Sequence, residues 1–256
     1  MKSAYTQMLQ DPSLPLVIKS MQKYLDDEAK LREKFYNDIN ETQKAEFING
    51  EIILHSPATY GHNLAMKRLI MAMESHVLLY SLGYIGFEKM MIHLSRNSYE
   101  PDICFFTTEQ ASKFAKSEKL FPAPSLIVEV LSPSTEKYDR DIKFNDYRQH
   151  NVKEYWIVDP INEHIEQYVM KNGKYRLNFN ARKGLIESEI ITGFKIDVKL
   201  LFDDDYYYEF VAQDKKKVIA LNKTIAEKDS QLAEKDNQLA EKEKIIAELM
   251  LKLKTE

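Results

Sequence analysis

Two nearly continuous apolar segments, with a helical segment between them, constrain the fold of this chain more than any other feature. The segments are Leu126–Leu131 and Glu154–Asp159. Runs of this length and composition are typical of interior strands that are covered on both faces. Residues 137–150 between them have the character of a helix. Because a strand, a helix and a second strand form a crossover unit, we expect two parallel neighbouring strands in an α/β fold.

Further segments extend this unit into a mixed central sheet flanked by helices. Asn49-Gly50 between two short apolar runs in Ala45–Ile53 predicts a β-hairpin. Residues 61–80 have apolar side chains mostly on one helical face, and Gly83 follows them. Other strands are expected at 84–91, 102–106, 164–170 and 175–179. Residues 1–40 predict one or two helices with an interruption near Asp26-Asp27.

The last part of the chain, residues 213–256, has a seven-residue repeat and contains no Gly or Pro. Its apolar residues stand seven apart, at Ile225, Leu232, Leu239, Ile246 and Leu253. A two-stranded coiled coil needs two apolar positions per heptad, and the second position here is mostly charged. We expect a long helix that forms a weak coiled coil and pairs protomers. The alternative is a single solvated helix with Glu–Lys pairs. The expected domains are thus 1–40 (helical extension), 41–212 (core) and 213–256 (tail).

Composition limits the classes of function. Cys104 is the single cysteine of the sequence, which excludes a disulfide framework within it and a cysteine-rich zinc site. The first residues include no apolar stretch typical of a signal peptide, and no run approaches the roughly 18 apolar residues of a membrane span. We therefore expect a cytoplasmic protein with no membrane partner. The net charge of -4 is mild evidence against a nucleic-acid partner.

Two acidic residues stand where their chemistry needs an explanation. Asp102 opens a predicted strand, and Glu129 lies inside the apolar run Leu126–Leu131. A buried carboxylate costs several kcal/mol unless it is ion-paired or bound to a metal. A divalent ion shared with Asp102 would compensate Glu129, and so would an ion pair with a nearby Lys or Arg. Lys143 shares a helical face with Asp139 and could point back to the carboxylates or form a surface ion pair with Asp139.

These residues carry a resemblance to a known family. Pro101-Asp102, Leu126–Thr135, Asp139-Arg140, Lys143, Tyr147 and Glu154–Pro160, with Glu46–Glu51, Ser56-Pro57 and Gly61-His62 upstream, resemble the Uma family of putative restriction endonucleases. That family belongs to the PD-(D/E)XK nuclease superfamily, and the similarity covers roughly residues 41–200. The resemblance implies a restriction-endonuclease-like sheet and an enzyme that hydrolyses phosphodiester bonds, with DNA as the expected partner.

The resemblance also implies roles for single residues. Asp102 and Glu129 would hold Mg²⁺ or Mn²⁺, which activates a water for attack on phosphate. The motif's lysine is expected two residues after Glu129, where this chain has Leu131, and Lys143 matches a replacement from the following helix. Glu46, Glu51 and His62 are further candidates for the catalytic site, each with the alternative of a solvent-facing or capping role. The competing function is an inactive nuclease-fold scaffold that binds partners through its C-terminal helix.

Overall fold

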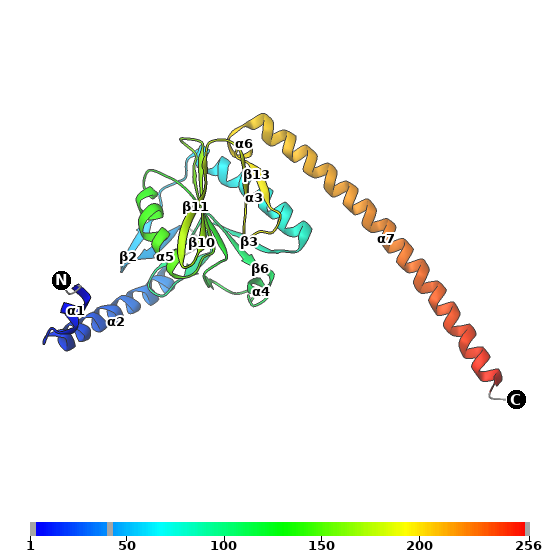
Figure 1. The fold of residues 1–256 in the computed structure, drawn as a ribbon, viewed down its shortest axis with the longest axis horizontal. Coiled ribbons are helices and arrows are strands. Elements are labelled where there is room, and N and C mark those ends of the chain that lie inside the picture. Colours follow the sequence, from blue (N-terminus) through cyan, green and yellow to red (C-terminus); the bar gives the residue numbers. More distant parts are fainter. Residues whose placement is uncertain (1–3, 40–42, 254–256) are drawn as a thin grey trace. The chain divides into compact units, whose positions relative to one another are not determined.

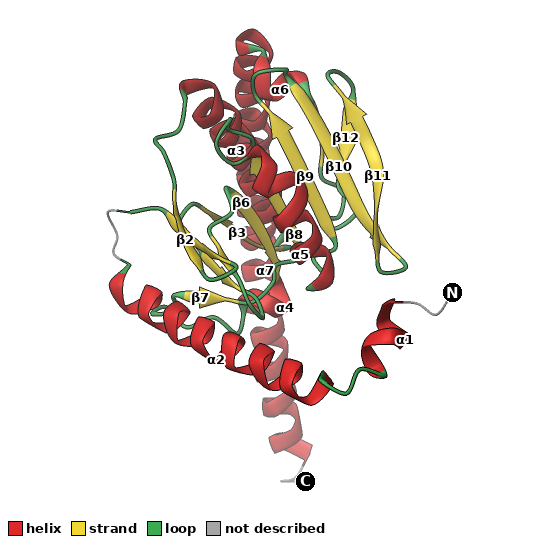
Figure 2. Ribbon diagram, turned by 90° about the vertical axis from the view of Figure 1, so that its left-hand side faces the viewer, coloured by secondary structure: helices red, strands yellow, loops and turns green. Residues whose placement is uncertain are grey.

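The protein forms two compact units, Met1–Phe202 and Asp203–Glu256. The structure is a computed structural model that describes residues 4–39 and 43–253. The first unit combines sheets with flanking helices, which confirms the predicted α/β class with a mixed sheet (Figures 1 and 2).

The central sheet has six strands in the order β11-β10-β9-β8-β6-β3. These are β3 (Gly83–Phe87), β6 (Ile103–Thr107), β8 (Leu126–Val130), β9 (Glu154–Asp159), β10 (His164–Lys171) and β11 (Lys174–Ala181). β8 and β9 run parallel, as the two apolar segments predict, and the other neighbours are antiparallel. Both are fully buried apart from the half-exposed end of β9 at Asp159, because helices and loops cover the two faces of the sheet's middle.

A second sheet has five strands in the order β2-β1-β5-β4-β7. They are β1 (Ala45–Ile48), β2 (Glu51–Leu54), β4 (Met91–His93), β5 (Ser98–Tyr99) and β7 (Leu120–Phe121), and a separate pair is formed by β12 (Leu185–Glu187) and β13 (Lys195–Asp197). The predicted hairpin is confirmed as β1–β2. Asn49 and Gly50 have φ angles of 53° and 88°, as a tight turn with two left-handed residues requires.

Helices connect and cover the sheets of the first unit. They are α1 (Ala4–Leu9), α2 (Leu14–Asp38), α3 (Tyr60–Tyr80), α4 (Thr108–Ala111), the π-helical turn η1 (Tyr138–Lys143), α5 (Phe144–Gln149) and α6 (Lys199–Phe202). The helix expected at 61–80 is confirmed as α3. The helix expected at 137–150 is η1 followed directly by α5, so its first part is wound more widely than an α-helix.

The predicted interruption of the N-terminal helix near Asp26-Asp27 is wrong. α2 passes through both residues without a break. The break lies before Leu14, where the Asp11 carboxylate accepts a hydrogen bond from the backbone N–H of Ser13 at 2.8 Å. Pro15 then stands in the first turn of α2, a position that tolerates a missing N–H.

One face of the central sheet and the helix that covers it create the setting of the candidate site. Cys104 on β6, Ile127 on β8 and Tyr155 on β9 belong to a buried cluster that also contains Tyr147 of α5. The Tyr147 ring packs edge-on against those of Tyr99 and Tyr155, at centroid distances of 5.2 and 5.4 Å. This aromatic packing fixes α5 and η1 against the sheet next to the point where β6 begins.

The second unit is one helix, α7 (Asp204–Leu253). It begins at Asp204, within the range 41–212 expected for the core domain. Leu232 and Leu239 of the heptad repeat are exposed along it, at 60% and 58% of their surface. Among the residues that the structure describes, no helix is both long and apolar enough to cross a bilayer.

Candidate active site

Asp102 and Glu129 lie on the same face of the central sheet. β6 and β8 are antiparallel with Ile103 opposite Val128 and Cys104 opposite Ile127. Extending this register by one residue sets Asp102 opposite Glu129. Directly opposed residues on an antiparallel pair have Cβ atoms about 5 Å apart. Two carboxylates therefore face each other at one end of the pair, an arrangement that repels unless positive charge is placed near it.

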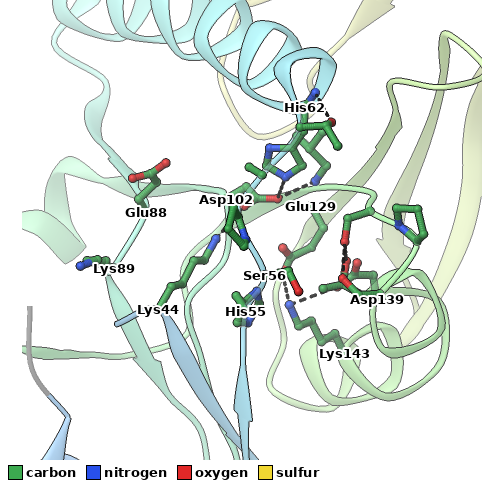
Figure 3. A pocket seen from close by; sticks show the side chains of 18 residues that line it. Lys44, His55, Ser56, His62, Glu88, Lys89, Asp102, Glu129, Asp139 and Lys143 are labelled. Atoms are coloured by element: carbon green, nitrogen blue, oxygen red, sulfur yellow. Dashed lines mark hydrogen bonds and ion pairs between the residues drawn. The ribbon is translucent and has the colours of Figure 1, made fainter. Parts of the chain in front are cut away.

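Both carboxylates line one pocket of about 500 Å³. Figure 3 shows its side chains, with Asp102 between His62 and Lys44, and with Glu129 directed towards Lys143. Asp102 and Glu129 are 5% and 3% exposed, so their charges are held in a poorly solvated place. The loop Ser56–Thr59 and the turn Ser132–Thr135 form the walls on either side.

Asp102 is held by three donors. Its Oδ1 pairs with Lys44 Nζ at 2.8 Å, and its Oδ2 lies 3.2 Å from His62 Nε2. The backbone N–H of Val130, which follows Glu129, donates to the same Oδ2 at 2.9 Å. Burial raises the pKa of Asp102, but the hydrogen bond from His62 and the charge of Lys44 outweigh burial and keep it below its usual range. Asp102 is thus ionised at neutral pH.

Glu129 belongs to a second group of charges centred on Lys143. The Lys143 ammonium lies 3.1 Å from Glu129 Oε1, 2.9 Å from Glu46 Oε1 and 3.1 Å from Asp139 Oδ1. The Tyr147 hydroxyl donates a hydrogen bond to Glu129 Oε1 at 2.8 Å. Lys143 is only 1% exposed, and its pKa is raised well above the usual value because the three carboxylates outweigh its burial. One buried cation therefore serves three acids.

The shortage of positive charge is visible at Glu129. Burial raises its pKa to about 8; Lys143 acts against this, while Asp139 and Asp102 add to it. Burial likewise raises the pKa of Asp139. The pocket therefore holds more carboxylates than its cations neutralise, which is the electrostatic condition in which a bound cation is favourable.

Local sequence explains how Lys143 reaches the sheet. Ser132-Pro133 ends β8, and the Ser132 hydroxyl contacts those of Ser134 and Thr135 at 3.0 and 2.9 Å, which closes a tight turn. η1 follows, and its wide winding places Asp139 and Lys143 together on the inner side. The alternative of an ion pair between Asp139 and Lys143 is realised, but this pair is buried and not on the surface. The ion-pair alternative for Glu129 is also realised, with Lys143 as its partner.

The three further candidates, His62, Glu46 and Glu51, differ in how close the structure places them to the pocket. His62 lies in the pocket at the start of α3, where its N–H donates to Thr59 Oγ1 and its ring reaches Asp102. Glu46 does not line the pocket but stands behind Lys143. Burial acts to raise the pKa of Glu46, but Lys143 and His55 outweigh burial and lower this pKa to about 2. Glu51 is exposed on β2 and is not brought to the site, because it faces outward at the turn end of the hairpin.

Leu131, at the position of the expected motif lysine, is part of the buried core and carries no charge to the pocket. The Lys143 ammonium provides a cation beside Glu129 instead.

Sequence reasoning missed three residues of this region. Lys44 pairs with Asp102, His55 lies 3.2 Å from Glu46, and the buried Glu100 accepts the N–H of Ala45 at 3.1 Å. Lys44 and His55 flank the two arms of the hairpin, and nothing in their local pattern marks them. Glu100 had a signal, since it stands two residues before Asp102 and alternates with it along an extended segment.

The donor set can be tested for a divalent metal. Mg²⁺ is commonly bound by one or two carboxylates and several waters, which Asp102 and Glu129 supply at a pocket open to solvent. No hydrogen bond of Glu129 Oε2 with a described residue is found, so this oxygen remains open to a ligand. Within residues 4–39 and 43–253, no cluster of three or more His, Cys, Asp or Glu side chains is arranged to hold a metal. The residues thus fit a site with two protein carboxylates and water, and not a fully protein-built cage.

Comparison with known proteins agrees with the fold and the motifs. An uncharacterized protein of Synechocystis sp. (strain ATCC 27184 / PCC 6803 / Kazusa), slr1290, is 31% identical over 193 residues, covering 73% of this chain and 94% of that protein. Another, sll1609, is 32% identical over 131 residues, covering 50% and 72% respectively. The crystal structure of a putative nuclease belonging to DUF820 from Anabaena variabilis ATCC 29413 has a TM-score of 0.58 at 19% identity, covering 66% of this chain and 96% of that one.

At that identity the crystal structure shows a shared nuclease-like fold and nothing about activity. Residues 30–199 match the Uma2 family, described as putative restriction endonuclease, and this range contains both carboxylates, Lys143 and the pocket. The chain therefore belongs to the Uma2 family of putative restriction endonucleases.

Proposed function

We propose that the protein is an endonuclease that hydrolyses phosphodiester bonds of DNA with a divalent metal ion, Mg²⁺ or Mn²⁺, held by Asp102 and Glu129. The observation that supports it is the meeting of both carboxylates and the Lys143 ammonium at one solvent-open pocket. Membership of the Uma2 family supports the same reaction class. The site suits phosphate chemistry, because two carboxylates can hold a divalent cation while an ammonium stabilises the negative charge that develops on the phosphate.

The chain's own residues divide the work. When bound, the metal ion supplies an acidified water and neutralises charge on the phosphate. Asp102 and Glu129 would hold it, with Asp102 released from part of its contact with Lys44. Lys143 orients Glu129 and offsets negative charge as it builds on phosphate. Lys44, half-buried at the pocket, lies where it can contact a non-bridging phosphate oxygen once it leaves Asp102.

Plasmid nicking tests the proposal. Supercoiled plasmid is incubated with Mg²⁺ or Mn²⁺ and either wild type or Asp102→Asn, and the relaxed form is quantified on gels. We expect metal-dependent nicking by wild type and a loss of more than about a hundredfold in the variant, because even residues that only support metal ligands contribute ten- to a hundredfold.

Glu109→Gln is the matched control, since Glu109 is an exposed acid of α4 outside the pocket. It should nick as wild type does. Equal nicking by wild type and Asp102→Asn would remove these carboxylates from the reaction, and no nicking by wild type under any metal would contradict the proposal.

A second function, an inactive nuclease-fold scaffold, has one observation in its favour. Both oxygens of Asp102 and one of Glu129 already have protein partners, so ion pairs compensate much of the buried charge without a metal. If wild type binds no Mn²⁺ and nicks no nucleic acid, this function replaces the first. α7 would then be the element that contacts partners.

A further inference from the structure

A second pocket, of about 860 Å³, adjoins the candidate active site. It lies between the C-terminal part of α2 and β7, elements that run side by side in Figure 2. We call it the flanking pocket and define it by Tyr36, Lys89, Met91, Glu100, Lys119 and Phe121, which line it together with neighbouring residues. Its volume is in the range of sites that take small organic molecules.

Two connections tie the flanking pocket to the site of Asp102. Lys89 lines both pockets, and Figure 3 shows it on the side of the active-site pocket away from Lys143. Glu100, which lines the flanking pocket, stands two residues before Asp102, so their Cα atoms are at most about 7 Å apart. A ligand bound at Asp102 therefore needs to extend by only about 7 Å to enter the flanking pocket.

The floor of the flanking pocket carries a carboxyl group with unused hydrogen-bonding capacity. Glu100 is 4% exposed, and its Oε2 accepts the backbone N–H of Ala45. Among the described residues, none forms a hydrogen bond with its Oε1. This oxygen is not among the fully buried side-chain atoms that lack a partner, so it is accessible from the pocket, where a ligand can donate a hydrogen bond to it.

The walls suit a flat aromatic ligand. Phe121 is fixed by the rings of Phe114 and Phe106, at centroid distances of 5.1 and 6.2 Å. Tyr36 is fixed by its hydroxyl, 2.6 Å from His93 Nδ1. Such rigid aromatic walls bind planar groups with little loss of entropy. Lys89 and Lys119 are exposed at the rim, where they can neutralise phosphates.

We propose that the flanking pocket binds the base of the nucleotide next to the scissile phosphate, with Glu100 accepting a hydrogen bond from the amino group of cytosine or adenine. This inference rests on the proposed nuclease function. Carboxylates accept from the cytosine amino group in known modes of base reading. Because Glu100 is at the bottom of a pocket, a base stacked in a duplex cannot reach it. The substrate is therefore single-stranded there or presents a base turned out of the helix.

Fluorescence anisotropy with the full chain tests the inference without relying on cleavage. Fluorescein-labelled oligo(dC) and oligo(dT) of equal length are titrated with Ca²⁺ in place of Mg²⁺. We expect wild type to bind oligo(dC) about tenfold more tightly, as one additional hydrogen bond provides. Glu100→Gln keeps an acceptor for Ala45 and turns a donor to the pocket, so the preference for oligo(dC) should vanish or reverse.

Two further variants separate base reading from general binding. Glu109→Gln changes an exposed acid that lines neither pocket, and it should keep the wild-type preference. Lys89→Ala should weaken both oligonucleotides by a similar factor and leave their ratio unchanged, because a rim lysine contacts phosphate.

The outcomes distinguish this inference from the proposed function. Equal binding of oligo(dC) and oligo(dT) by wild type and by Glu100→Gln would overturn the inference, even if Asp102-dependent nicking is observed. A base preference that depends on Glu100, found without any nicking, would support the flanking pocket and reject the nuclease. If wild type binds neither oligonucleotide, the inference fails.

Discussion

Lys143 is the residue on which the buried charges of the candidate site depend. It is the shared partner of Glu46, Glu129 and Asp139, and it lies over the Tyr99 ring with Nζ 5.8 Å from the centroid. A buried ammonium with three carboxylates has both a structural and an electrostatic role. The two roles can be separated by measuring stability and metal binding on different variants.

Lys143→Met should lower the free energy of unfolding by about 3–5 kcal/mol, because it leaves buried carboxylates without their cation. Urea unfolding followed by fluorescence measures this. Lys113→Met is the matched control, since its ion pair with Glu109 is solvent-exposed, and a change below about 1 kcal/mol is expected there. Similar losses in both variants would contradict the importance of the buried cluster.

Glu129→Gln should separate metal binding from folding. It removes one proposed metal ligand, so the affinity for Mn²⁺ should fall more than about tenfold. It also replaces a buried carboxyl group, whose pKa burial raises to about 8, by an amide that never ionises, so the melting temperature should stay the same or rise. Calorimetric titration and thermal unfolding give the two values. Unchanged Mn²⁺ affinity would exclude Glu129 as a ligand, with Glu109→Gln as the exposed control.

At the scale of elements, β9 is tied to its surroundings by a carboxylate without a cation. Glu154 is fully buried and accepts hydrogen bonds from the side chains of Trp156, Gln167 and Ser188 and from the backbone N–H of Ile190. These donors join β9 to β10 and to the segment after β12. Burial raises the pKa of Glu154 above its usual 4.5, and the four donors act against this.

This shift predicts a pH dependence of stability. A glutamate with a raised pKa holds its proton more tightly in the folded state, so its contribution is present below pH about 4.5 and is lost as pH rises through the folded pKa. The glutamine of Glu154→Gln does not titrate, although its amide NH₂ faces side-chain and backbone groups that donate to the carboxylate of the wild type. Wild type should therefore lose stability relative to Glu154→Gln as pH rises from about 4. Urea unfolding across pH measures the difference, and a difference that grows in favour of wild type would contradict the shift.

The elements show where sequence patterns suffice. Parallel β8 and β9, the β1–β2 hairpin and α3 follow from apolar runs, turn residues and helical periodicity, which are local signals. The break in the N-terminal helices does not follow from such signals. Asp26-Asp27 resembles a helix end, but the break is set by a side-chain turn at Asp11 and Ser13. Two adjacent acidic residues are tolerated inside a long helix. Local sequence rules therefore do not distinguish such an internal pair from a pair that ends a helix.

At the scale of the whole molecule, α7 is a unit of its own that offers one apolar residue per heptad. Because Leu232 and Leu239 are exposed along this helix, we predict that α7 pairs protomers through them. Removing residues 204–256 should reduce the mass measured by light scattering from that of an oligomer to that of a monomer. The melting temperature should not change, because the core of Met1–Phe202 is formed within that unit.

Leu232→Lys with Leu239→Lys should have the same effect on mass in the full chain, since it places charge on the proposed seam. If deleting residues 204–256 lowers the measured mass per particle only by the mass of the deleted segment, α7 is not the assembly element.

The sequence by itself determined the α/β class and the main strands of the central sheet, although the strand expected at 84–91 ends at Phe87 and the short strands β4, β5, β7, β12 and β13 were not predicted. Together with the family resemblance it also marked Asp102 and Glu129 as candidates, because one opens a predicted strand and the other is a charge inside an apolar run. The tertiary structure alone decided which other charges surround them. Lys44, His55 and Glu46 arrive from the hairpin, and Glu51 of the same hairpin does not. Side-chain alternation specifies the face of a strand, but the pairing of distant segments decides which faces meet. Electrostatic compensation of a buried carboxylate depends on that meeting and not on neighbours along the chain.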